Sequence, residues 1–287
     1  MEKFYIDKLN RDEQIELAKN ILSEKLIPLV SNEDTKELLI EKINNLSVVY
    51  LERQEFLDLQ DLKEGDYNVP LACYGRGTVF MQNTRGINSK EFHGLIHEII
   101  HSLSDHFKYD GKLGLLEGYF DENDVCQNRY KVINEAATEY ITSSVLGEPF
   151  YCYSQDLKYT LELILQLAHI SYEELLNIYF GKERWVTKEL ASRFNGDDIT
   201  LLPKLLEEYD TRISSDINDE YNFSHVSEIL LRTVNYKLDN HEHFDHEYVG
   251  GLLNKLLKDC YWVDMDVKTI EYYNDTIDRL LYYIKNR

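Results

Sequence analysis

Two histidines four residues apart, in His97-Glu98-Ile99-Ile100-His101, place the strongest constraint on this chain of 287 residues. Apolar residues around them recur at three- and four-residue spacing, which is typical of a helix with one buried face. The pattern predicts a helix from about Ser89 to Phe107, with an apolar stripe of Phe92, Leu95, Ile96, Ile99, Ile100 and Leu103. Residues four apart lie one turn above each other, so we expect both imidazoles to project from one face and to be able to bind one zinc ion.

Three neighbouring residues fit the same interpretation. Asn88 followed by Glu91 is typical of a helix N-cap with a carboxylate three residues further on. Glu98 stands next to the first histidine, where its carboxylate can act on a water molecule at the metal rather than on the metal itself. The motif is therefore predicted to lie on the element that its chemistry requires.

The composition indicates a folded globular protein of one large domain or two modest ones, because 43% of the residues are hydrophobic and 12% are aromatic. The formal net charge of −21 disfavours nucleic acid and anionic membranes as partners, since both carry phosphate groups that this charge repels.

A cytoplasmic location is expected. The first ten residues lack the pattern of a signal peptide, and no apolar run approaches the roughly 20 residues that span a bilayer. The cysteines are scattered and form no C-x-x-C pair, so we expect free thiols in a reducing compartment; they are Cys73, Cys126, Cys152 and Cys260.

The periodicity predicts a mostly helical chain with one β-hairpin. Helices are expected over 11–30 and 35–51, where 48–51 also suits an extended segment, and a polar stretch follows over 52–65. Two short strands flank Tyr74–Gly77, and the second is a candidate edge along which an extended peptide can pair. A Gly- and Asp-rich connection over 108–129 is long enough to carry a short element.

After that connection the pattern is helical almost throughout. A helix over 130–146 is expected to end at Gly147. Further helices are predicted near 155–170, 171–181, 183–194, 200–209, 222–238, 246–260 and 266–285.

A catalytic zinc site needs a third protein ligand and an open position. The metzincin pattern requires a glycine and a histidine where this chain has Ser104 and Phe107, so that family is excluded. His106 is rotated away from the two motif histidines and is a poor ligand from the same helix. Glu135 and Glu139 lie four apart on the second helix and share a face. One carboxylate can bind the metal while the other accepts a hydrogen bond from a ligand histidine, and the spacing alone leaves open which does which.

These residues resemble the gluzincin clan of zinc metallopeptidases, of which thermolysin is a member. The resemblance covers about 88–147 and rests on His97-Glu98-x-x-His101 followed by Asn134-Glu135-x-x-x-Glu139. It implies one zinc ion with His97, His101 and Glu135 as ligands, Glu98 as general base, and Glu139 orienting the first histidine, where thermolysin-like enzymes use aspartate. The stretch from His101 to Glu135 is longer than in thermolysin, which keeps the choice between Glu135 and Glu139 open.

Together, the periodicity and the resemblance predict the fold, and the resemblance also implies an activity. The fold class is α+β, predominantly helical. The periodicity predicts a helical N-terminal region (1–65) and a helical C-terminal region (151–287) that packs on the core, and the resemblance implies a zincin-like catalytic core (66–150) in which a small hairpin precedes the active-site helix. The expected activity is hydrolysis of a peptide or protein substrate by a zinc-activated water. A second electrophile for the developing oxyanion is required, and no spacing selects among the candidates Tyr119, Tyr130, Tyr140, His169 and His225.

Two further groups of histidines carry an expectation. His93 lies one turn before His97 and is predicted either to line the cleft or to cap it. His241 to Glu247 is rich in potential ligands but falls at a break between helices, so a solvated loop is expected.

Three alternatives stay open. The first is a catalytically inactive zinc-binding regulatory or interaction protein of the same fold, against which the intact Glu98 argues. The second is another zinc hydrolase such as a peptide deformylase, whose Glu-Gly-Cys-Leu motif is absent here. The third is an acidic helical interaction protein that binds no metal.

Overall fold

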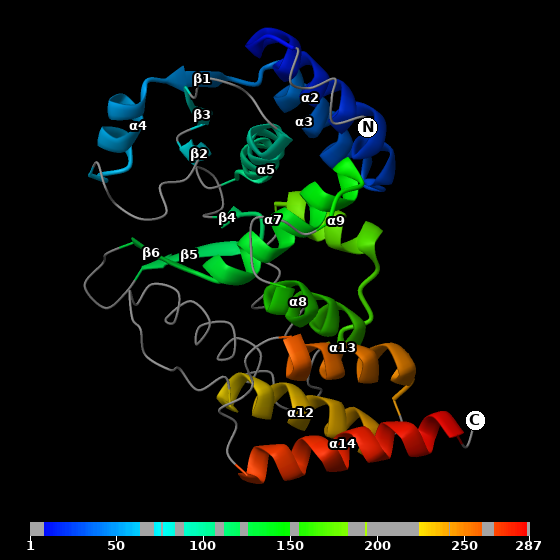
Figure 1. Ribbon diagram of the computed structural model, residues 1–287. Helices are drawn as coiled ribbons and strands as arrows, with labels where there is room; N and C mark the ends of the chain where they lie inside the picture. The colour runs from blue at the N-terminus through cyan, green and yellow to red at the C-terminus, as the bar shows by residue number, and fades with distance from the viewer. Residues whose placement is uncertain are drawn as a thin grey trace. The chain divides into compact units, whose positions relative to one another are not determined.

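The computed structural model describes residues 9–63, 72–75, 77–83, 89–106, 112–120, 126–149, 155–182, 193, 224–240, 242–259 and 267–285. These residues are predominantly helical and include two small sheets, as predicted (Figure 1). Within them, no helix combines the length and the apolar character needed to cross a membrane.

The chain forms two compact units, each assembled from separate stretches. Unit 1 comprises Met1–Gly114, Thr138–Cys152 and Leu176–Lys182, and unit 2 comprises Leu115–Ala137, Tyr153–Leu175 and Glu183–Arg287. The division into 1–65, 66–150 and 151–287 stays a prediction about the organisation of the chain.

Unit 1 contains a three-stranded sheet of order β1-β3-β2, built from β1 (Val48–Leu51), β2 (Ala72–Gly75) and β3 (Thr78–Gln82). The predicted hairpin is confirmed, because β2 pairs antiparallel with β3 and Ala72 lies opposite Met81. Between them Gly77 has a φ of 83°, a left-handed conformation that glycine adopts at no steric cost. β1 pairs with β3 in parallel.

The prediction that β3 is an edge strand is wrong. Among the strands that the structure describes, β3 is central, and β2 is the edge on the hairpin side of the sheet. The physical reason is that β1 pairs with the side of β3 that faces away from β2, with Val48 opposite Val79. Because β1 lies about 30 residues earlier in the chain, the hairpin pattern alone does not reveal this pairing.

The N-terminal helices of unit 1 begin at side-chain caps. α2 (Arg11–Lys25) starts at Asn10, whose side chain accepts from the Glu13 amide while the Glu13 carboxylate accepts from the Asn10 amide, and α3 (Glu33–Asn44) starts at Asn32. The helix predicted over 11–30 ends earlier, and a 3-10 turn η1 (Ile27–Leu29) follows it. The helix predicted over 35–51 ends at Asn44 and gives way to β1.

The polar stretch predicted over 52–65 contains a short helix, α4 (Arg53–Leu59). It buries Phe56 and Leu57 completely, and a capping box joins Glu52 with Glu55 at its start. Two buried apolar residues in seven are too few to produce a visible helical period, which explains why the sequence pattern missed it.

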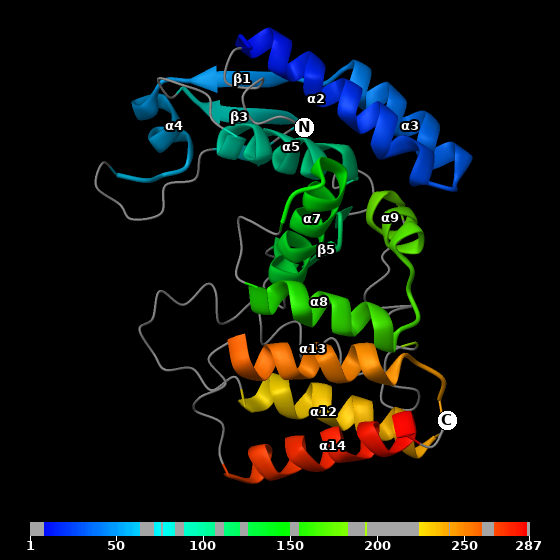
Figure 2. The ribbon, with the colours of Figure 1, turned by 45° about the vertical axis from the view of Figure 1, so that its right-hand side comes forward.

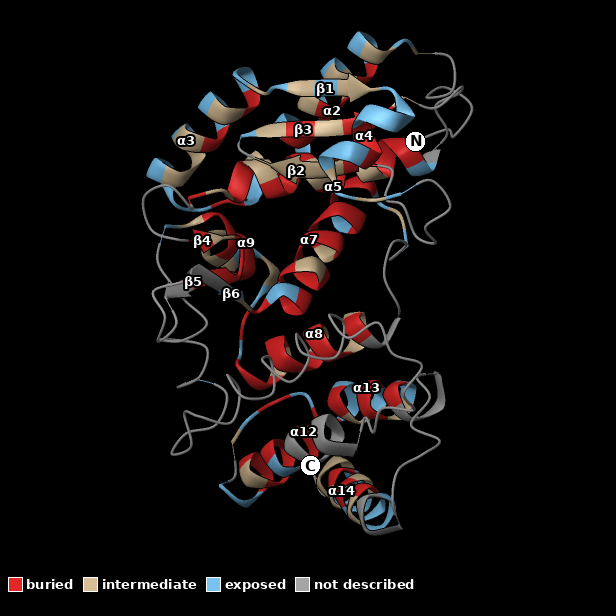
Figure 3. Ribbon diagram, turned by 90° about the vertical axis from the view of Figure 1, so that its left-hand side faces the viewer, coloured by how far each residue is buried: buried red, intermediate tan, exposed pale blue. Residues whose placement is uncertain are grey.

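The motif helix is α5 (Ser89–Ser104), which packs against β2 and β3 (Figure 2). Its predicted apolar stripe is confirmed: each of the six residues is at most 1% exposed. Buried positions accordingly mark much of α5 in Figure 3. The predicted N-cap Asn88 and the predicted last residue Phe107 lie outside the described residues.

The C-terminal end of α5 is closed by groups from elsewhere in unit 1. Nζ of Lys42 donates to the backbone oxygens of Leu103 and Asp105, each at 2.8 Å. β4 (Lys112–Leu113) turns back beside the same end, where the His106 amide donates to the Lys112 oxygen at 2.8 Å. A cation at this position complements the negative end of the helix dipole.

The second motif helix is α7 (Lys131–Leu146), and it ends as predicted at Gly147. Gly147 has a φ of 68°, and the amide of Glu148 donates to the oxygen of Ser143 at 3.0 Å. This is the hydrogen bond of a Schellman C-cap, which reverses the chain immediately after the helix.

Unit 2 carries a strand pair and a set of packed helices. β5 (Leu116–Phe120) and β6 (Cys126–Arg129) pair antiparallel inside the predicted Gly- and Asp-rich connection. The predicted C-terminal helices appear as α8 (Gln155–Leu167), α9 (Tyr172–Phe180), α12 (Ser224–Asp239), α13 (His246–Asp259) and α14 (Val267–Lys285). α13 packs against both α8 and α14, and α12 packs against α14 (Figure 2). The helices predicted over 183–194 and 200–209 lie outside the described residues, apart from Arg193.

Lys42 makes the stability of the fold depend on pH. Burial lowers the pKa of its ammonium group to about 8 from the ordinary 10.5, although the Asp105 carboxylate partly opposes this change. Between pH 8 and 10.5 the unfolded chain binds more protons at this site than the folded chain, so its contribution to the free energy of unfolding rises with pH across that window. This contribution is measured by urea unfolding of the native protein and of Lys42→Met at several pH values. As the pH rises, the free energy of unfolding of the native protein is expected to increase relative to that of Lys42→Met. If the difference in free energy of unfolding between the two proteins does not change with pH, the lowered pKa of Lys42 is contradicted.

Candidate metal centre

The side chains of His97 and His101 on α5 converge with that of Glu135 on α7. Their ligand atoms all lie within 4.8 Å of one another, and this is the one group of three or more such ligands among the residues that the structure describes. The boundary between the two units falls inside α7, between Ala137 and Thr138, but α7 is an unbroken helix. Glu135 is therefore positioned by the same helix that brings Thr138 and Glu139 to α5.

Each of the two imidazoles has its Nδ1 directed at a side chain of α7. Nδ1 of His97 lies 3.2 Å from Oε2 of Glu139, and Nδ1 of His101 lies 3.4 Å from Oγ1 of Thr138. The Thr138 hydroxyl in turn lies 2.6 Å from the hydroxyl of Tyr179. When Nδ1 is engaged in this way, Nε2 is the nitrogen that can bind a metal.

The donor set fits a zinc ion. Two imidazole nitrogens and one carboxylate oxygen are the ligands of the His₂Glu type of catalytic zinc site, which leaves a fourth position open. Both histidines are buried, at 4% and 6% exposure, and an oxygen atom lies beside Nδ1 of each ring. Such oxygen partners are common for zinc-bound histidines because they fix the tautomer and the orientation of the ring.

The geometry separates the two carboxylates of α7. Glu135 belongs to the converging group and is half-buried, whereas Glu139 is completely buried and lies beside Nδ1 of His97. This arrangement favours Glu135 as the metal ligand and Glu139 as the group that orients the first histidine.

The base candidate Glu98 acts electrostatically on the hairpin of unit 1. Burial and the negative charge of Glu98 together raise the pKa of the Cys73 thiol to about 11, and Cys73 belongs to β2. Sγ of Cys73 also accepts from Nε2 of Gln60 at 2.8 Å. Glu98 is half-buried, and its negative charge acts on a residue of β2, the outer strand of the hairpin.

The candidate oxyanion donors lie on several elements. Tyr140 follows Glu139 on α7 and is half-buried, whereas His169 is exposed in the turn after α8 with a φ of 55°. Tyr130 is fully buried just before α7, with the Arg129 guanidinium 5.1 Å from its ring centre. Tyr119 on β5 and His225 on α12 belong to described backbone, but their side chains lie outside the description. The choice among these five stays a prediction.

Sequence reasoning missed several residues around the site. Thr138 stands three residues after Glu135, so its place on the same face of α7 could have been inferred from helical spacing. Tyr179 and Glu148 are brought in by tertiary structure alone, and no pattern points to them. Asn134 of the motif has a different task, because its side-chain oxygen accepts from the Leu115 amide at 2.8 Å and holds the start of β5.

The second histidine-rich segment only partly matches the expected solvated loop. His243 and Asp245 are exposed, but Phe244 and His246 are buried, and His246 begins α13. Oδ1 of Asp245 accepts from the Tyr248 amide at 2.9 Å and caps that helix.

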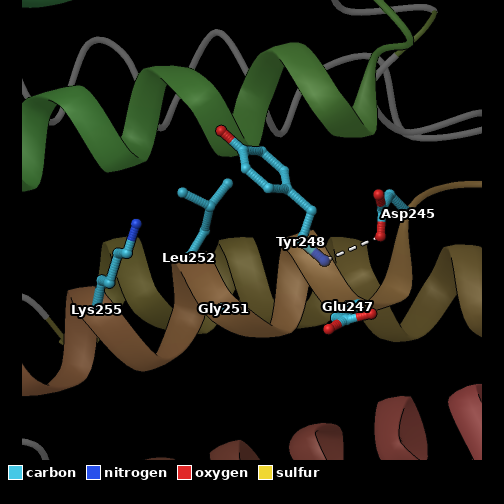
Figure 4. Close-up of a pocket in the computed structure, with 6 residues that line it drawn as sticks. All are labelled: Asp245, Glu247, Tyr248, Gly251, Leu252 and Lys255. Carbon is cyan, nitrogen blue, oxygen red and sulfur yellow. Dashed lines mark hydrogen bonds between the residues drawn. The ribbon is translucent and has the colours of Figure 1, made fainter.

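A pocket of about 320 Å³ lies on α13, lined by Asp245, Glu247, Tyr248, Gly251, Leu252 and Lys255. Figure 4 shows the ring of Tyr248 directed from α13 toward α8. None of the lining residues belongs to the converging group of ligands. This pocket is therefore separate from the candidate metal centre.

Comparisons with protein-family models, with curated proteins and with solved structures each find no match. The likeness to gluzincins accordingly rests on the motif residues, and the zincin-like core stays a prediction.

The proximity of Glu98 to Cys73 has a measurable consequence. Glu98→Gln removes a negative charge that disfavours the thiolate, so the pKa of Cys73 is expected to fall from about 11. The measurement is the pH dependence of alkylation of the Cys73 peptide, followed by mass spectrometry in the presence of a chelator. Glu16→Gln, a surface change on α2, is the control and should leave the profile unchanged. If Glu98→Gln and the native protein show the same pH dependence of Cys73 alkylation, the Glu98 carboxylate does not act on Cys73.

Proposed function

We propose that this chain is a zinc-dependent metallopeptidase in which His97, His101 and Glu135 hold one zinc ion and Glu98 is the general base. The observation that carries the proposal is the convergence of the three ligand atoms within 4.8 Å, on the two helices that bear the motif. The neighbouring Glu98 and the orienting contacts at both histidines support it further.

A zinc ion at such a site would act as a Lewis acid, activating water and polarising the carbonyl group of the substrate. The Glu98 carboxylate accepts the proton of the attacking water and passes it to the nitrogen of the leaving amine. Its half-buried position next to the first ligand suits this work, because a base must reach both the water and the substrate. Glu139 and Thr138 contribute by holding the two imidazole rings in place.

The substrate is a peptide or protein segment in extended conformation. Support comes from β2, the edge strand beside α5, with Cys73 within electrostatic reach of Glu98. An extended peptide that adds to this edge by backbone pairing would pass the base. Recognition through main-chain hydrogen bonds accommodates many side chains, so specificity would come from neighbouring residues.

A catalytic role is favoured over a zinc-binding regulatory role. A structural zinc site is normally closed by four protein ligands, whereas three converge among the residues that the structure describes. A purely structural site also has no use for a half-buried carboxylate at Glu98.

The metal assignment is tested by zinc analysis. The purified chain is expected to take up about one equivalent of zinc, and Glu135→Gln should bind it far more weakly because a charged ligand is lost. Glu174→Gln removes an acidic side chain of α9 outside the ligand group and is the matched control. Less than about a tenth of an equivalent in the native protein would end the proposal, since an intact three-ligand site should fill.

The catalytic assignment is tested with Glu98→Gln on a peptide library. The variant is expected to keep its zinc and to lose about 10²- to 10⁴-fold in kcat, the range for removal of a general base. Cleavage of the library at the native rate by this variant would refute Glu98 as the base. A native protein that carries zinc and cleaves nothing would instead favour the regulatory role.

A further inference from the structure

We infer that His93 is a positioning residue of this metal centre, which holds the Glu139 carboxylate in the orientation that fixes His97 and is itself held by Glu148. The inference rests on the zinc site proposed above. It adds a role for two residues, His93 and Glu148, that the gluzincin-like motif does not include.

The contacts form a continuous path between α5 and the C-terminal end of α7. Nε2 of His93 lies 3.0 Å from each oxygen of Glu139, and Nδ1 of His93 lies 3.2 Å from Oε2 of Glu148. The second oxygen of Glu139 also meets Nδ1 of His97 at 3.2 Å. Imidazole and carboxylate therefore alternate from His97 through Glu139 and His93 to Glu148.

Burial explains why Glu139 needs this partner. Its carboxylate is completely shielded from solvent, and a buried charge is costly unless hydrogen-bond donors satisfy it. Its partners include the two imidazoles and the Ser143 hydroxyl, which lies 3.4 Å from Oε1. Because His93 approaches both oxygens equally, it restricts the rotation and the shift of the carboxylate group. Oε2 of Glu139, held in place in this way, then orients the ring of His97 through its contact with Nδ1.

The far end of the path depends on the turn that ends α7. The left-handed conformation of Gly147 and the Schellman hydrogen bond reverse the chain, so Glu148 follows directly where the helix stops. The Glu148 side chain is 30% exposed, whereas that of His93 is 1% exposed. Each ring nitrogen of His93 thus faces a carboxylate, Nε2 that of Glu139 and Nδ1 that of Glu148, and Glu148 fixes the ring from the more exposed side.

An ordinary core histidine of the same unit looks different. His106 is also buried, but its Nε2 lies 2.9 Å from the backbone oxygen of Phe180, and burial lowers its pKa. The ring nitrogen Nε2 of His106 thus faces a backbone oxygen rather than a carboxylate. His106 is therefore the matched control for the loss of a buried imidazole that is not connected to the site.

The test is the zinc affinity of the full-length chain, measured by competition with a chelator. His93→Phe keeps an aromatic ring and removes both ring nitrogens, and about ten-fold weaker binding is expected, the lower end of the range for partners of metal-bound histidines. His106→Phe should bind zinc as the native protein does, whatever its effect on the melting temperature. His93→Gln retains one donor for Glu139 and should restore part of the affinity.

A double-mutant cycle shows whether His93 acts through Glu139. In a Glu139→Gln background, His93→Phe is expected to have little further effect on zinc affinity, because the group that it positions is already altered. The absorption spectrum of the cobalt-substituted protein should change with His93→Phe and stay native with His106→Phe. If His93→Phe proves unstable, His93→Gln and Glu148→Gln are measured in the same cycle.

The outcomes separate this inference from the peptidase proposal. Unchanged zinc affinity in His93→Phe, or an equal loss in both backgrounds, would overturn the positioning role. A native protein that binds zinc but cleaves no peptide would refute the peptidase and leave the affinity measurements to decide on His93. A native protein that binds no zinc would overturn both.

Discussion

The arrangement of the two motif helices depends on the contacts of one buried carboxylate, that of Glu139, with histidines of α5. It has no access to solvent, and it lies within hydrogen-bonding distance of two histidines of α5. A charge in that position is tolerated only while its partners stay in place, so a slide or rotation of either helix would leave it unsatisfied. The position of Glu135 follows from it, because the two residues are one turn apart on the same helix.

α5 meets two different demands on its two faces. Its apolar face packs on β2 and β3, which gives the helix a fixed seat in unit 1. Its polar face presents His93, His97 and His101 at four-residue intervals, all buried. These three imidazoles can be buried because a ring nitrogen of each lies close to an oxygen atom of α7 or of the turn that follows α7. The packing of α5 against α7 thus also orients the candidate ligands, because an oxygen atom faces Nδ1 of both His97 and His101.

Much of the site was predictable from local patterns. The period of the apolar stripe located α5, the glycine at 147 marked the end of α7, and four-residue spacing put each pair of ligand candidates on a shared face. The division of labour between Glu135 and Glu139 was open from spacing alone, because both project from the same side of α7. The rotational setting of α7 against α5 distinguishes them: it directs Glu135 into the ligand group and Glu139 to the back of His97.

The sequence by itself determined most of the helices, the hairpin and the chemical types of the candidate ligands, since these depend on residues within one or two turns of each other. Tertiary structure alone decided that β1 completes the sheet and makes β3 central, that Tyr179 meets Thr138, and that Glu148 returns to His93. Those pairings join positions 31 to 55 residues apart, beyond the reach of any local period. They form because buried polar groups and sheet edges must find partners when the chain becomes compact.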